Sequence, residues 1–172
     1  MTDDAMPLAL HEESVKPEWI DYNGHMNVAY YVLAFDHATD RLLEYLGVGE
    51  PYLREHSASV FVVESHVTYE NELVVDDPLR FETYLLGHDD KRLHFFHMMY
   101  HASEGFVAAT NELLAVHMDM RTRRAVPFAT ESKSAQLRLW ERHNALPLPP
   151  QVGRVIGLRN KRPGRPTDGT IS

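Results

Sequence analysis

"VAYYVLAFDHATDRLLEYLG", residues 28–47, is the stretch from which the architecture of the chain can be predicted. Its apolar side chains recur at intervals of three and four residues, which predicts a helix of about five turns. Gly47 stands where a helix ends in the left-handed conformation. The first half, VAYYVLAF, is apolar on nearly every face, so this helix must be buried on more than one side. The apolar positions are Val28, Tyr31, Phe35, Ala38, Leu42 and Leu46.

The sequence on both sides of this helix indicates long strands. Residues 8–16 predict a first strand, ended by Pro17, and a polar loop near residues 54–57 leads into alternating side chains over residues 61–69. Three further strand patterns follow, joined by the turns HDDK and ASEG, which favours an antiparallel meander. These strand patterns are LRFETYLLG, RLHFFHMMYH and GFVAATNELLAVHMDM.

A second helix is predicted over residues 130–144, with Thr130 or Ser132 as its cap. We therefore expect an α+β fold, in which a curved antiparallel sheet of five or six strands wraps the long central helix and a C-terminal helix follows. Residues 1–150 would form this single domain, and residues 151–172 a basic, partly flexible tail. An edge strand with little protection favours a homodimer, with a tetramer as the larger alternative.

Composition excludes several classes of function. The chain of 172 residues suits one domain, and it has no run of about 18 apolar residues that could span a membrane. It has no cysteine, which excludes a thiol nucleophile and a thiolate metal site. A net charge of −8 disfavours a nucleic-acid partner. The acidic N-terminus lacks the features of a signal peptide, so we expect a cytoplasmic protein.

The 11 histidines raise the question of a metal site. His97 and His101 share a strand face, but they are separated along the strand by about 13 Å, too far for a common ion. His117 and Asp119 share a face without a third ligand nearby. We therefore expect no bound metal and no other cofactor.

Hydrogen-bonding side chains are crowded at the start of the central helix, in DYNGHMN, residues 21–27. Asn27 can cap the helix, and Gly24 gives the backbone the freedom that a sharp entry needs. Capping does not explain Asp21, Asn23 and His25. In an extended segment alternate residues point to the same side, so these three side chains would converge beside the helix N-terminus.

The Asp21-x-x-Gly24 spacing resembles the hotdog-fold acyl-CoA thioesterases of the 4-hydroxybenzoyl-CoA thioesterase type. The fuller set, Asp21-x-Asn23-x-His25-x-Asn27, is similar to that of the plant acyl-ACP thioesterases, which carry a further glutamate on the strand after the helix. Glu72 in VTYENEL takes that place here, and Glu64, earlier on the same strand, is a second candidate. The stretches IDYNGHMN, FDHATDRLLEYLGV and KRLHFFH resemble a narrower group, the betainyl-CoA thioesterases associated with L-carnitine dehydrogenases. The likeness covers roughly residues 8–120.

This resemblance implies hydrolysis of an acyl-CoA, most closely betainyl-CoA to betaine in carnitine degradation. Asp21 would act as the general base on water or as the nucleophile, and the two routes stay open. Asn23 and His25 would orient Asp21 or the water, and Glu72 would be the further catalytic acid. Backbone N–H groups near Val28, at the positive end of the helix dipole, would hold the developing oxyanion.

A betainyl group carries a trimethylammonium, which is recognised by aromatic faces and nearby negative charge. Trp19, Tyr22 and Tyr30 cluster around the loop and are candidates for such a cage, with Glu64 adding charge. The alternative, that Trp19 and Tyr30 are ordinary core aromatics, carries equal weight. With Gly24, Asn27 and Val28, these residues complete the expected substrate-binding set.

Two other functions stay open from the sequence. Hotdog hydratases pair an aspartate with a nearby histidine, as Asp21 and His25 would, although Asn23 and Asn27 have no function in that reaction. Hydration of an enoyl-CoA without release of thiol would support this alternative. The other is a non-catalytic acyl-CoA-binding sensor, for which binding without turnover would be the sign.

Overall fold

A computed structural model describes residues 6–158, so the predicted tail from residue 159 on lies outside the described residues. None of the helices within residues 6–158 is long and apolar enough to cross a membrane. In chain order the elements are β1 (Leu8–Ser14), η1 (Pro17–Trp19), α1 (Val28–Tyr45), α2 (Glu50–His56), β2 (Ala58–Tyr69), β3 (Pro78–His88), β4 (Arg92–His101), β5 (Val107–Asp119), β6 (Arg124–Ala125) and α3 (Thr130–His143).

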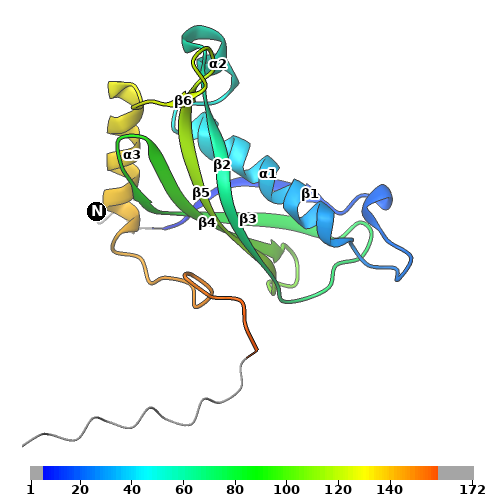
Figure 1. The fold of residues 1–172 in the computed structure, drawn as a ribbon. Coiled ribbons are helices and arrows are strands. Elements are labelled where there is room, and N and C mark those ends of the chain that lie inside the picture. Colours follow the sequence, from blue (N-terminus) through cyan, green and yellow to red (C-terminus); the bar gives the residue numbers. More distant parts are fainter. Residues whose placement is uncertain (1–5, 159–172) are drawn as a thin grey trace, which may run out of the picture.

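The strands of the described part form one antiparallel sheet in the order β1-β3-β4-β5-β2, with β6 paired to β5. The sheet curves around α1, which lies across one of its faces (Figure 1). This confirms the predicted α+β arrangement of a central helix wrapped by an antiparallel sheet and followed by a C-terminal helix.

The core lies between α1 and the sheet. In the first half of the helix Phe35 is fully buried and meets Phe81 of β3 edge-to-face, with ring centroids 5.9 Å apart. In the second half Leu42 is equally buried and packs in one cluster with Leu139 of α3. Burial of this helix along its length explains why its first half is apolar on nearly every face.

Three local predictions were wrong. The expected polar loop at residues 54–57 is mostly part of helix α2. An ion pair at 2.6 Å between Glu50 and Arg54, which lie one turn apart, supports this helix. The N-cap of α3 is Ala129, without a side-chain cap bond, so neither predicted residue caps it. The first strand ends at Ser14, two residues before the predicted end, because Val15 already bonds to the loop after β2 through Asp77.

Strand β2 forms one edge of the sheet, pairing with β5 on one side only within residues 6–158. A bulge between Val62 and Glu64 interrupts the expected alternation. Val62 and Val63 are consequently both exposed, by 43% and 58%. A long strand edge with exposed apolar side chains is unusual for a surface that stays in water.

Candidate active site

The loop before α1 is a tight turn closed by its own backbone. The N–H of Asp21 donates to the carbonyl of His25, and the N–H of Gly24 donates to the carbonyl of Asp21, both at 3.0 Å. Gly24 has φ +84°, a left-handed conformation that favours glycine. The N–H of Met26 donates to the carbonyl of Leu73 at 2.8 Å, which fixes the turn against the segment after β2.

The start of α1 has one backbone donor left over. Asn27 caps the helix as predicted, because its Oδ1 accepts from the N–H of Ala29 at 3.0 Å. The carbonyl of Asn27 accepts from the N–H of Tyr30. The N–H of Val28 has no partner within the described part of the chain, so it is the donor that a bound oxyanion would find at the positive helix end.

Three side chains at this turn are placed by short contacts. Asp21 Oδ1 accepts from the backbone N–H of Asn23 at 2.8 Å, which leaves its other oxygen free of hydrogen bonds among residues 6–158. His25 Nε2 lies 3.2 Å from Oε2 of Glu72, which joins the turn to the segment after β2. The Glu72 side chain is 75% exposed, so this pair orients the imidazole more than it stabilises the fold.

A cavity of about 350 Å³ opens between the turn, the start of α1 and the end of β2. It brings together five of the residues predicted from the sequence: Asp21, Asn23, His25, Val28 and Glu72. The other lining residues were not predicted as site residues, and they are Met26, Tyr31, Tyr69, Glu70 and Asn71. Three carboxylates at one cavity favour a ligand with positive charge.

Two tyrosines that sequence analysis had not assigned to the site form the aromatic wall of this cavity. Tyr31 and Tyr69 meet edge-to-face with ring centroids 5.2 Å apart, and the Tyr69 hydroxyl donates to the carbonyl of Val28 at 3.4 Å. Burial raises the pKa of Tyr31 to about 12, with the carboxylate of Glu72 acting in the same direction. Tyr31 is therefore a neutral phenol that supplies no charge, and its hydroxyl donates to the backbone carbonyl of Asn71 at 3.4 Å.

The remaining predicted residues lie elsewhere. Trp19 is only 2% exposed and stacks on Tyr30 at a centroid distance of 5.7 Å, whereas Tyr22 is 97% exposed. These three rings do not line the cavity beside Asp21. Glu64 lines a separate cavity of about 640 Å³, formed by β2, β4, β5 and residues 153–156.

Geometry and fold together define a class of protein. The chain belongs to the thioesterase-like superfamily, whose family model matches residues 15–137. The resemblance to the hotdog thioesterases that the turn and central helix predicted is thereby confirmed.

Particular relatives narrow this class. A Pseudomonas aeruginosa protein named betainyl-CoA thioesterase is 39% identical over 151 residues, which cover 88% of this chain and 95% of that protein. A Rhizobium meliloti protein named L-carnitine dehydrogenase/betainyl-CoA thioesterase is 34% identical over 153 residues, 89% of this chain but 31% of that longer protein.

Solved structures show the same arrangement of elements. A hypothetical protein from Staphylococcus aureus, solved in complex with CoA, superposes with a TM-score of 0.82 at 27% identity, over 89% of this chain and 97% of that one. A putative thioesterase from Pseudomonas putida superposes with a TM-score of 0.77 at 29% identity, over 90% of this chain and 98% of that one.

Proposed function

We propose that this chain hydrolyses acyl-CoA thioesters, with betainyl-CoA as its substrate in carnitine degradation and Asp21 as the catalytic carboxylate. The observation that carries the proposal is one cavity in which Asp21, His25, Glu72 and the unpaired N–H of Val28 face the same space. The Pseudomonas aeruginosa relative of nearly equal length supports the choice of acyl group.

The reaction needs little beyond positioning, because a thioester carbonyl is electrophilic and a thiolate is a good leaving group. In the general-base route Asp21 takes a proton from a water molecule, whose oxygen forms the new bond to the carbonyl carbon. The C–S bond then breaks, the products are a carboxylate and the CoA thiol, and the proton passes to the sulfur. In the alternative route Asp21 attacks the carbonyl itself and water hydrolyses the resulting anhydride.

The negative charge that develops on the carbonyl oxygen is stabilised at the start of α1. The N–H of Val28 and the positive end of the helix dipole meet at this point of the cavity. One backbone donor of this kind typically lowers a barrier by about 2.7–4 kcal/mol. Capping by Asn27 fixes the first helical turn, so we propose that Asn27 positions this donor.

Recognition of a trimethylammonium requires aromatic faces and negative charge near the reacting carbonyl. In this cavity Tyr31 and Tyr69 supply the faces, and Glu72 supplies the charge. Glu70 adds less, because Arg154 pairs with it at 3.4 Å. Each good cation–π contact contributes roughly 0.5–2 kcal/mol. We therefore assign the cationic end of the substrate to this pair of tyrosines.

A matched pair of substrates tests the proposal. We expect betainyl-CoA to be hydrolysed with a kcat/KM about 10–100-fold higher than tert-butylacetyl-CoA, which has the same shape but a carbon in place of the charged nitrogen. Release of thiol is the measurement. Equal rates on the two substrates would contradict the betainyl assignment. Binding without thiol release, or hydration of an enoyl-CoA instead, would contradict thioester hydrolysis altogether.

We further propose that the protein is a homodimer joined along β2. One edge of this 12-residue strand is unpaired among residues 6–158, and its exposed valines and this edge offer a second copy both apolar area and hydrogen bonds. Pairing of two such edges would continue the antiparallel sheet across both chains.

Light scattering should therefore give a mass twice the 19.8 kDa of one chain. Val63→Lys, which places a charge on the exposed edge strand, should weaken dimerisation and raise the Kd of the dimer by at least about tenfold. Val75→Lys, at a valine of similar exposure in the loop after β2, is the control and should keep the dimer. A monomeric wild type, or a Val63→Lys dimer as tight as the wild type, would contradict the proposed interface.

A further inference from the structure

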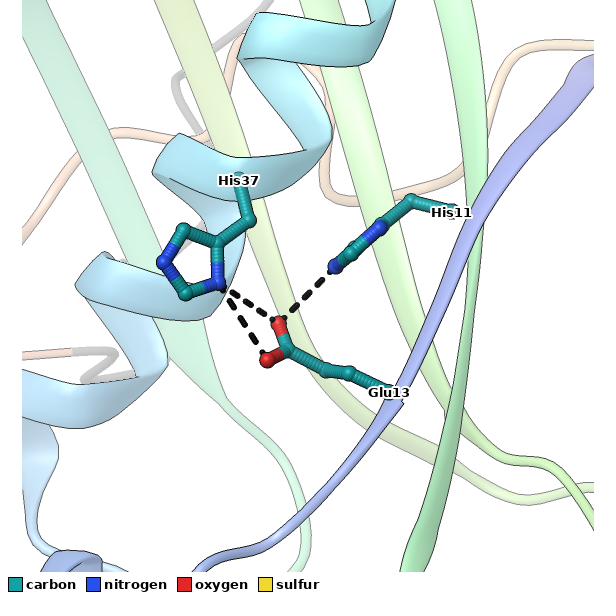
Figure 2. Close-up of side chains that lie close together, drawn as sticks. All are labelled: His11, Glu13 and His37. Atoms are coloured by element: carbon teal, nitrogen blue, oxygen red, sulfur yellow. Dashed lines mark hydrogen bonds and ion pairs between the residues drawn. The ribbon is translucent and has the colours of Figure 1, made fainter.

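A second cluster of chemically reactive side chains lies outside the active-site cavity, between β1 and α1. His11 and Glu13 are two residues apart on β1 and therefore point to the same side of the strand. That side faces α1, where His37 completes the group (Figure 2). Among residues 6–158, these three form the one set of three or more ligand side chains close enough for a metal ion.

The ligand atoms of this cluster converge on one point. Nε2 of His11 lies 3.0 Å from Oε1 of Glu13, and Nδ1 of His37 lies 3.1 and 3.2 Å from the two carboxylate oxygens. All three ligand atoms lie within 4.8 Å of one another. Ligands of a tetrahedral zinc ion are about 3.3 Å apart at ordinary Zn–N and Zn–O bond lengths. The distances from each histidine to Glu13 are thus within a few tenths of an ångström of those around zinc, and the two histidine nitrogens, at most 4.8 Å apart, would have to approach each other by no more than about 1.5 Å.

The environment of the cluster favours a bound cation. The side chains of His11 and Glu13 are 14% and 11% exposed, and that of His37 is 34% exposed, so an ion can enter from the His37 side. The His11 ring lies against Phe81 at a centroid distance of 5.1 Å, which limits its movement. Asp36 and Asp40, on the exposed surface of α1 beside His37, add negative charge.

We propose that His11, Glu13 and His37 bind one zinc ion, with a fourth position open to water. Two imidazoles and one carboxylate are a donor set that zinc binds readily, whereas magnesium prefers oxygen ligands alone. The ion would bind to both β1 and α1, and so hold this edge strand to the central helix. None of the three residues lines the cavity beside Asp21, so the zinc site is separate from the proposed hydrolase site.

Metal binding here competes with protons. Without an ion, the carboxylate of Glu13 accepts hydrogen bonds from the two imidazoles. With zinc, both coordinating nitrogens lose their protons, which move to the other ring nitrogens or are released to water.

Calorimetry with zinc chloride on the full-length protein, freed of metal with EDTA and then desalted, tests the proposal. We expect one zinc per chain, a melting temperature that rises with zinc and no effect of magnesium. Glu13→Gln and His37→Gln should each lower zinc affinity by at least about tenfold, because each removes one of three ligands. His56→Gln, which removes an exposed imidazole beside Glu55 on α2, is the matched control and should bind zinc as the wild type does.

His37 is the most exposed member, so His37→Gln keeps the test valid even if Glu13→Gln is poorly folded. A wild type that takes up no zinc at micromolar concentration would overturn the proposal, and the cluster would then be a hydrogen-bonded triad alone. Equal zinc binding by wild type and His37→Gln would overturn it as well.

Discussion

Asp21→Asn should release thiol from betainyl-CoA at least about 100-fold more slowly than the wild type, with little change in KM. A general base in the transition state typically contributes about 10²–10⁴-fold, and an amide can neither take the proton from water nor attack the thioester. Because we assign binding of the acyl group to the tyrosine faces and the remaining carboxylates of the cavity, we expect substrate affinity to survive the substitution. Steady-state measurements of kcat and KM would separate the effect on turnover from the effect on substrate binding.

The substitution should leave the turn intact, which makes the result interpretable. The hydrogen bond from the N–H of Asn23 goes to Oδ1 of Asp21, and an asparagine at this position offers an oxygen to the same donor. Asp36→Asn, at an exposed acid of α1 remote from the cavity lining, is the matched control and should retain full activity. Full activity of Asp21→Asn would contradict the assigned mechanism.

A single turnover in ¹⁸O-labelled water distinguishes the two routes to product. If Asp21 is a general base, the label enters the released carboxylate directly. If Asp21 is the nucleophile and water attacks the aspartyl carbon of the anhydride, the label enters Asp21 itself. Label found by mass spectrometry in the peptide containing Asp21 after one turnover would therefore establish the anhydride route.

The central helix and the turn before it could be predicted because their signals are local. Helical spacing from Val28 to Leu46, and the crowding of Asp21, Asn23 and His25, are visible within short windows of sequence. Asn27 was predictable as the cap for the same reason. Such patterns depend on residues a few positions apart, and tertiary packing did not override them.

The rest of the site depends on contacts between distant parts of the chain. Tyr31 fits an apolar helix position and Tyr69 fits a strand position, and nothing local places the two rings 5.2 Å apart. The fold brings them together because the end of β2 lies beside the start of α1. The same holds for His37, which meets His11 and Glu13 across 24 or more residues of sequence, so spacing along a single strand does not predict this cluster.

Lowering the pH from 6.5 should cost this protein about 1.4 kcal/mol of unfolding free energy per pH unit through His97 alone. Its imidazole is completely buried on β4. Nδ1 lies 2.8 Å from the hydroxyl of Thr83 on β3, and Nε2 lies 3.0 Å from the hydroxyl of Thr39 on α1. Burial lowers the pKa of His97 from 6.5 to about 3, and His11 of β1 acts in the same direction. The other rings packed against it, Phe35 and Phe95, are uncharged.

The sign follows from proton binding. Between pH 6.5 and about 3 the unfolded chain binds a proton at His97 and the folded chain does not, so stability falls as the pH falls. From pH 6.5 to 4.5 the loss is about 2.3 kcal/mol, because the slope reaches its full value only about one pH unit below the unfolded-state pKa. This is a large share of the stability of an ordinary domain. Urea unfolding at a series of pH values, with EDTA present to remove metal linkage, measures the slope.

His97→Gln should be less dependent on pH by about 1.4 kcal/mol per unit, because glutamine can bond to both threonine hydroxyls but does not titrate. The comparison concerns slopes, so a lower absolute stability of the variant does not disturb it. His66→Gln, which removes a partly exposed imidazole from β2, should keep the wild-type slope.

The ring resonances of His97 give a second readout in the wild type, since a buried neutral imidazole should show no titration above pH 4.5. Titration of His97 near pH 6.5 in the wild type, or equal slopes for wild type and His97→Gln, would contradict this prediction. Either result would mean that hydrogen bonds from the two threonines stabilise the charged imidazole enough to offset the cost of burying it.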